Sequence, residues 1–115
     1  MSNRKVAIIT AMLIMSGLAI GSGESFSSTD GAEAATVLIK DFAFHPQTLV
    51  VETGAIVTWL NGDSAPHRIK FPDFESRTLN KGDTFTHAFN ATGTFGYICS
   101  FHPSMRGTVV VHEME

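Results

Sequence analysis

Short β-rich runs, separated by turn residues every six to twelve positions, are the feature of this 115-residue chain that most limits its fold. From Thr36 onward no window of helical periodicity interrupts them. Strands this short can bury an apolar face only when two sheets stack, so the pattern predicts an all-β, eight-stranded Greek-key β-sandwich. The expected strands are 36–42, 48–51, 55–61, 67–71, 76–79, 84–89, 94–99 and 107–112.

Composition supports a modest core and argues against one class of partner. Hydrophobic residues make up 43% of the chain and charged residues 17%, which is ordinary for a globular protein. The formal net charge is −3, whereas a nucleic-acid-binding domain would show a basic patch. Alternation within the runs predicts the core pairs Val57 and Trp59, Phe85 and Phe89, and Phe95 with Tyr97.

The N-terminus has the features of an export signal. Two basic residues precede the uncharged apolar run Val6–Ile20, which is shorter than the about 20 residues needed to span a membrane. We therefore expect 1–23 to be a signal peptide, 24–35 a linker and 36–115 the folded domain. The protein is then periplasmic or otherwise extracytoplasmic, and it is attached to a membrane only if residues 6–20 are retained as an anchor.

The chain holds a single cysteine, Cys99, within the stretch C-S-F-H-P-S-M. In an exported protein a lone thiol is a free reactive group, an intermolecular bridge or a ligand. His102 and Met105 follow at spacings of three and six, and all three side chains carry soft or borderline donor atoms. Three protein donors leave a metal site open, and His67, which follows Pro66 at the start of an expected strand, is the best fourth candidate.

Two imidazoles, a thiolate and a weak thioether form the ligand set of an electron-transfer copper site, which holds one type 1 copper ion. Thiolate and imidazole accept both Cu(I) and Cu(II), and the thioether helps to set the potential. Zinc is the competing metal because it favours thiolate and histidine ligands. It is the weaker interpretation, since methionine binds zinc poorly and only one cysteine is present.

These residues resemble a known family. The run C-S-F-H-P-S-M resembles the C-x-x-H-x-x-M copper loop of amicyanins, and the stretch from F-A-F-H-P-Q to D-S-A-P-H resembles the first half of the amicyanin and plastocyanin pattern. The resemblance spans residues 36–112 and implies a blue copper protein, or cupredoxin. It implies the Greek-key sandwich and, as copper ligands, His67, Cys99, His102 and Met105.

One residue departs from that family pattern. An asparagine usually follows the first ligand histidine and helps to tie its strand to the cysteine loop, but here the residue is Arg68. We expect the side-chain tie to Ser100 to be lost or replaced, with consequences for the tuning and rigidity of the site. Arg68 and Arg106 are either solvated charges or a positive rim that orients an anionic partner.

The sequence therefore predicts an exported electron carrier that is not an enzyme. We expect a monomer that meets redox protein partners transiently, near His102. The alternative is a copper-binding or trafficking module that holds the metal without shuttling electrons. An oxidase or nitrite-reductase-like enzyme would need further copper sites. The remaining histidines are His45, His87 and His112, and they do not cluster in the sequence as such sites require.

Overall fold

The computed structural model describes residues 33–114, and every regular element among them is a β-strand. The strands are β1 (Ala34–Lys40), β2 (Ala43–His45), β3 (Thr48–Glu52), β4 (Ala55–Asn61), β5 (Ile69–Lys70), β6 (Thr84–Phe89), β7 (Gly93–Cys99) and β8 (His102–His112). None of these residues lies in a helix long and apolar enough to cross a membrane. The predicted signal peptide and most of the predicted linker lie outside the described residues.

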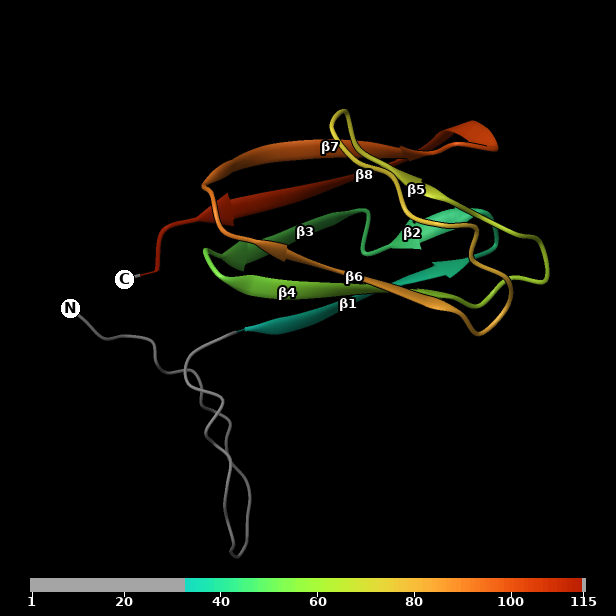
Figure 1. Ribbon diagram of the computed structural model, residues 1–115, viewed down its shortest axis with the longest axis horizontal. Coiled ribbons are helices and arrows are strands. Elements are labelled where there is room, and N and C mark those ends of the chain that lie inside the picture. Colours follow the sequence, from blue (N-terminus) through green and yellow to red (C-terminus); the bar gives the residue numbers. More distant parts are fainter. Residues whose placement is uncertain (1–32, 115) are drawn as a thin grey trace, which may run out of the picture. The chain divides into compact units, whose positions relative to one another are not determined.

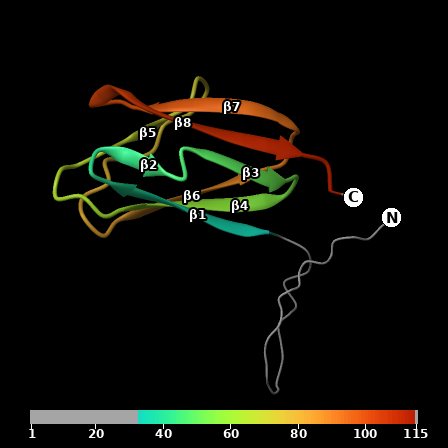
Figure 2. The same ribbon diagram turned by 180° about the vertical axis from the view of Figure 1, so that it is seen from behind.

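The strands form two four-stranded sheets that face each other (Figures 1 and 2). One sheet has the order β2-β1-β4-β6 and the other the order β3-β8-β7-β5. Two pairings are parallel, β1 with β4 and β3 with β8, and the rest are antiparallel. β1–β2 and β7–β8 are hairpins within one sheet, whereas every connection from β2 to β7 crosses from one sheet to the other. The predicted all-β sandwich is confirmed.

Residues 33–114 form eight strands, the predicted number, but they are not the same eight. Residues 76–79 form only isolated bridges, His67 with Leu79 and Lys70 with Glu75 nearby, so the expected strand there is wrong. Residues 43–45 form β2, which the sequence did not suggest. The last strand begins at His102 and not at Gly107, and the first begins at Ala34.

The core lies between the sheets and is rich in aromatic rings. Trp59 is fully buried and meets Tyr97 edge to face, with ring centroids 5.5 Å apart. Tyr97 also packs on Phe44 and Phe71. Val57 and Phe89 are buried, while Phe85 and Phe95 are partly buried against the same cluster. The predicted core pairs are thus confirmed.

One end of the sandwich gathers three connections that carry most of the chemistry-bearing residues. These are the β1–β2 turn, the loop from β4 towards β5, and the β7–β8 turn, at the right of Figure 1. The loop after β4 is held by Asn61, whose fully buried amide donates to the carbonyls of Ala65 (2.9 Å) and Leu79 (2.7 Å). The same amide's oxygen accepts the backbone N–H of Asp63. The polar end of β4 therefore shapes the loop that leads to His67.

Candidate metal centre

A shift in strand register places Cys99 beside His102. Ile98 pairs with Arg106, but the next residue of β7, Cys99, pairs with His102, so residues 103–105 are extra on β8 and bulge from the ladder. The sequence predicted a loop between Cys99 and Gly107; the structure has a tight turn and then a bulged strand start. Cys99 is fully buried, Met105 is 5% exposed, and His102 is partly buried.

The His67 side chain also approaches Cys99. Its backbone is fixed by two hydrogen bonds with Leu79, N–H to O at 3.0 Å and the reverse at 2.8 Å. Its fully buried ring lies with Nδ1 3.5 Å from the Cys99 Sγ. The His67 and His102 rings have centroids 5.7 Å apart at 62°. The structure thus brings these three side chains together, and Met105 is buried on the strand that begins at His102.

Asp63 determines which nitrogen of His67 is available. The carboxylate Oδ2 lies 2.9 Å from His67 Nε2, and Asp63 is 6% exposed. Because an ionised carboxylate only accepts hydrogen bonds, Nε2 carries the proton and donates, which leaves the Nδ1 lone pair directed at the Cys99 sulfur. Burial opposes ionisation, but hydrogen bonds from the Phe42 N–H, the His67 ring and the Asp41 N–H lower the pKa of Asp63 below its ordinary value.

The same carboxylate holds the β1–β2 turn. Asp41 and Phe42 both have positive φ, 54° and 56°, and the flanking residues Lys40 and Ala43 pair, which is the geometry of a type I′ hairpin turn. Such turns normally use glycine or asparagine, because a left-handed conformation costs other residues about 1–2 kcal/mol each. Asp63 accepts both backbone N–H groups, at 2.7 and 2.9 Å, which offsets this cost.

Phe42, at the tip of that turn, covers the two histidines. Its ring stands edge-on to His67 at 5.2 Å and to His102 at 5.0 Å, yet half of the side chain remains exposed. Phe101 is also exposed, at 46%, in the β7–β8 turn. Exposed aromatic side chains therefore stand both against the His102 ring and beside it in the sequence.

Sequence reasoning missed Asp63, Phe42 and Glu75, whose carboxylate accepts a hydrogen bond from Ser100 beside Cys99. Only Asp63 carried a usable signal, an acidic residue in a loop four positions before the candidate histidine. Among residues 33–114, no three His, Cys, Asp or Glu side chains are already placed to hold a metal ion together, so His67, Cys99 and His102 lie near one another without forming a finished site. His45 and His87 lie elsewhere, on Lys40 and on Phe74 respectively.

The chain is similar to proteins of one known family. Residues 5–111 match the family model described as a cupredoxin-like domain. Amicyanin-alpha of Methylorubrum extorquens is 33% identical over 91% of this chain and 93% of its own length. Plastocyanin of Scenedesmus fuscus is 31% identical over 59% of this chain and 85% of its own length.

Solved structures show the same likeness. An amicyanin variant in its reduced state superposes with a TM-score of 0.66 and 33% identity, covering 72% of this chain and 84% of that one. A purple cupredoxin from Nitrosopumilus maritimus gives a TM-score of 0.64 and 36% identity, covering 67% and 98%.

Proposed function

The chain belongs to the cupredoxin-like family, and from that premise we propose that it is an exported protein that carries single electrons between redox partners. The cofactor is one type 1 copper ion, which when bound supplies a one-electron Cu(I)/Cu(II) couple. The observation that carries the proposal is the approach of the His67 Nδ1 to the Cys99 Sγ, 3.5 Å apart with both side chains fully buried.

We propose as ligands His67, Cys99, His102 and Met105, and the donor atoms suit copper. A thiol and an imidazole lone pair face each other out of water, and a thioether is buried nearby on β8. The His67 tautomer is set by Asp63, as is usual for metal-binding histidines, whose second N–H is donated to a carboxylate or carbonyl. A site that relies on a thioether favours copper over zinc.

The surroundings suit a carrier that must change charge without changing shape. His67 is held through its backbone by Leu79 and through its ring by Asp63. Cys99 lies at the end of the β7–β8 ladder, and Met105 lies in the bulge of β8, and both are buried in the hydrophobic core cluster. Rigid donors leave little to reorganise with each electron. We propose that partners approach the His102 edge across the apolar surface of Phe42 and Phe101, in brief contacts typical of redox proteins.

The proposal is tested with the full chain loaded with Cu(II). An intense visible band, expected to be blue, should appear from thiolate-to-copper charge transfer, with a reversible potential in voltammetry. Cys99→Ser should abolish the band, whereas His87→Gln, which alters a histidine outside the site, should keep it.

Two outcomes would contradict the proposal. If the copper-loaded protein shows no band, or if Cys99→Ser keeps the band, the proposed ligands are wrong. A coloured protein that exchanges no electron reversibly and releases copper rapidly to chelators would instead be a copper-binding or trafficking module. Export is tested separately, by the N-terminal residue of the protein recovered from cells.

A further inference from the structure

The Arg68 side chain contacts other residues of the protein and is not a freely solvated charge. Its Nη2 donates to the Thr78 hydroxyl at 2.8 Å, and its Nη1 lies 3.6 Å from the Glu75 Oε2. The guanidinium carbon also stands over the Phe101 ring, 5.7 Å from the centroid. About one third of the side chain is exposed. The contacts bind the residue next to His67 to a neighbouring turn and to the tip of the β7–β8 turn.

Glu75 completes a bridge between two segments of the site. The oxygen that Arg68 approaches, Oε2, also accepts the hydroxyl hydrogen of Ser100, the residue after Cys99. Beneath it the Ser100 N–H donates to the Arg68 carbonyl at 3.0 Å. The hydrogen bond from Ser100, together with the charges of Arg68 and Lys70, lowers the pKa of Glu75, so the carboxylate is ionised at neutral pH.

The backbone fixes Glu75 in this place. The chain reverses after β5 through the hydrogen bond from the Phe71 N–H to the Phe74 carbonyl, 2.8 Å. Glu75 then bridges Lys70, and Ser76 binds Ile69 twice, through its N–H and through its hydroxyl oxygen. The carboxylate is therefore part of an ordered reversal of the chain.

We propose that Glu75 is a positioning residue for the metal centre, joining the strand of His67 to the Cys99 turn through Arg68 and Ser100. The inference rests on the proposed function and deepens it. An ion pair as exposed as that of Arg68 and Glu75 contributes little to stability by itself. Its role is geometric, because loss of a partner around a metal ligand typically weakens metal binding about 10–100-fold.

The first test measures copper release from the loaded full chain to a chelator. Glu75→Ala should release copper about 10-fold faster or more, and shift the visible band. Ser100→Ala should behave alike, and the double variant should be no worse than the worse single one, because both break one bridge. Glu75→Gln, which still accepts from Ser100, should restore most of the wild-type rate. Asp73→Ala is the matched control, since it removes a negative charge from the same turn.

The second test needs no metal. Cys99 is fully buried, so its labelling by a thiol reagent in the metal-free chain reports opening of its turn. Global unfolding, measured in urea, also exposes the thiol, so its contribution to the labelling rate is subtracted first. Glu75→Ala should then still label faster than wild type, whereas Asp73→Ala should not.

The outcomes separate this inference from the proposed function. If Glu75→Ala matches Asp73→Ala in copper release and in thiol labelling, the positioning role is overturned. If the wild-type chain forms no coloured copper site, the proposed function fails, and faster labelling in metal-free Glu75→Ala would still show the bridge. A Glu75→Gln variant as impaired as Glu75→Ala would also overturn the bridge.

Discussion

At the scale of single residues, Asp63 joins two parts of the structure that are far apart in the sequence. Its carboxylate accepts the N–H groups of Asp41 and Phe42 and the ring N–H of His67, all within 2.9 Å. One side chain thus supports a left-handed turn and orients a proposed ligand. Hydrogen bonds to a buried charged group are among the stronger ones, worth about 1.5–3 kcal/mol each.

Replacing Asp63 with asparagine should show this. An amide offers one acceptor oxygen instead of two, and its NH₂ group would face a donor, so at least one of the three donors loses its partner. The free energy of unfolding of the metal-free chain should fall by about 1–3 kcal/mol, measured in urea.

Asp83→Asn is the control for that measurement, because Asp83 accepts from the Asn80 N–H and from Arg77 at the surface. It should change the unfolding free energy by less than about 1 kcal/mol. Equal effects of the two substitutions would mean that Asp63 has no special role in the fold.

The residues that could be predicted from the sequence are those whose relation is local. Cys99, His102 and Met105 fall within seven positions, so their donor types could be read together, and His67 was the remaining candidate beside a proline. The roles of Asp63 and Glu75 depend on how two turns fold back on neighbouring strands. No spacing along the chain encodes that approach, which is why the replacement for the expected Ser100 tie became visible only in the structure.

At the scale of elements, strands 55–61 and 84–89 were predicted with the bounds that the structure shows, because alternation and turn residues agree at both ends. The first strand was extended wrongly to residue 42. Alternation continues through Asp41 and Phe42, but their positive φ values turn the chain. Asp63 stabilises that turn from 21 residues away, so no local pattern reveals it.

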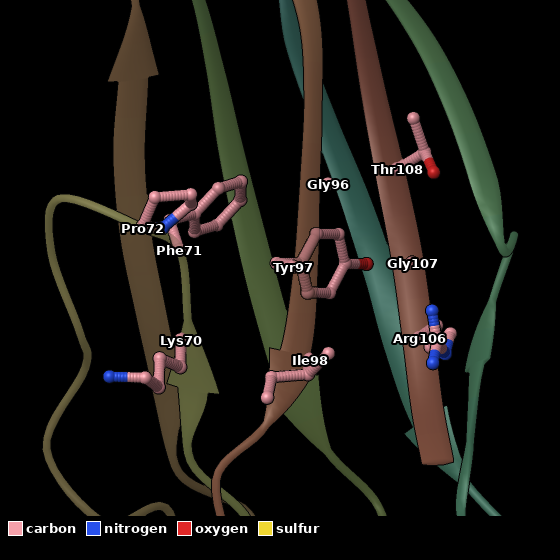
Figure 3. A pocket seen from close by; sticks show the side chains of 9 residues that line it. All are labelled: Lys70, Phe71, Pro72, Gly96, Tyr97, Ile98, Arg106, Gly107 and Thr108. Atoms are coloured by element: carbon pink, nitrogen blue, oxygen red, sulfur yellow. The ribbon is translucent and has the colours of Figure 1, made fainter. Parts of the chain in front are cut away.

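The β7–β8 pair offers a test of packing at this scale. Tyr97 pairs with Gly107, and Figure 3 shows its phenol oxygen turned toward that glycine. A Cβ at position 107 would collide with the Tyr97 ring, which is buried against Trp59 and Phe44 and has little room to move. Gly107→Ala should therefore lower the unfolding free energy by about 1–3 kcal/mol, measured by urea denaturation.

The same two strands supply a matched control. Gly96 lines the open groove of Figure 3, and a Cβ there would meet nothing within 4 Å. Gly96→Ala should leave stability unchanged or slightly higher. If Gly107→Ala is as stable as Gly96→Ala, the Tyr97 ring does not occupy the space above position 107.

At the scale of the whole molecule, a series of aromatic contacts runs from Trp59 in the core to His87 on β6. Trp59 contacts Phe71, Phe71 stacks on Phe74 with centroids 4.6 Å apart, and Phe74 stacks on His87 at 4.0 Å and 18°. The turn after β5 thereby closes the space beside β6. Burial lowers the pKa of His87, and the charge of Asp73 only partly opposes this shift.

This shift makes a prediction about pH. A histidine with a depressed pKa in the folded state binds its proton more readily when unfolded. His87 therefore contributes full stability above its ordinary pKa of 6.5, and the contribution is lost as pH falls from there through the folded-state pKa. His87→Gln should weaken the acid sensitivity, measured as the difference in unfolding free energy between pH 7.5 and 5 in metal-free protein. If the variant and the wild type show the same difference in unfolding free energy between these two pH values, the prediction is wrong.

The parallel pairing of β3 with β8 fixes when the metal site can exist. Leu49 pairs with Val109, so the second sheet closes only after nearly the whole chain is available. Contacts between such distant residues make folding slow, on the order of milliseconds to seconds. Three of the four proposed ligands lie beyond residue 98, and the Cys99 thiol is fully buried in the folded protein. A chain still emerging from the ribosome thus presents only His67 of the four proposed ligands, so the proposed site can form only once residues 99–105 are available and the second sheet has closed.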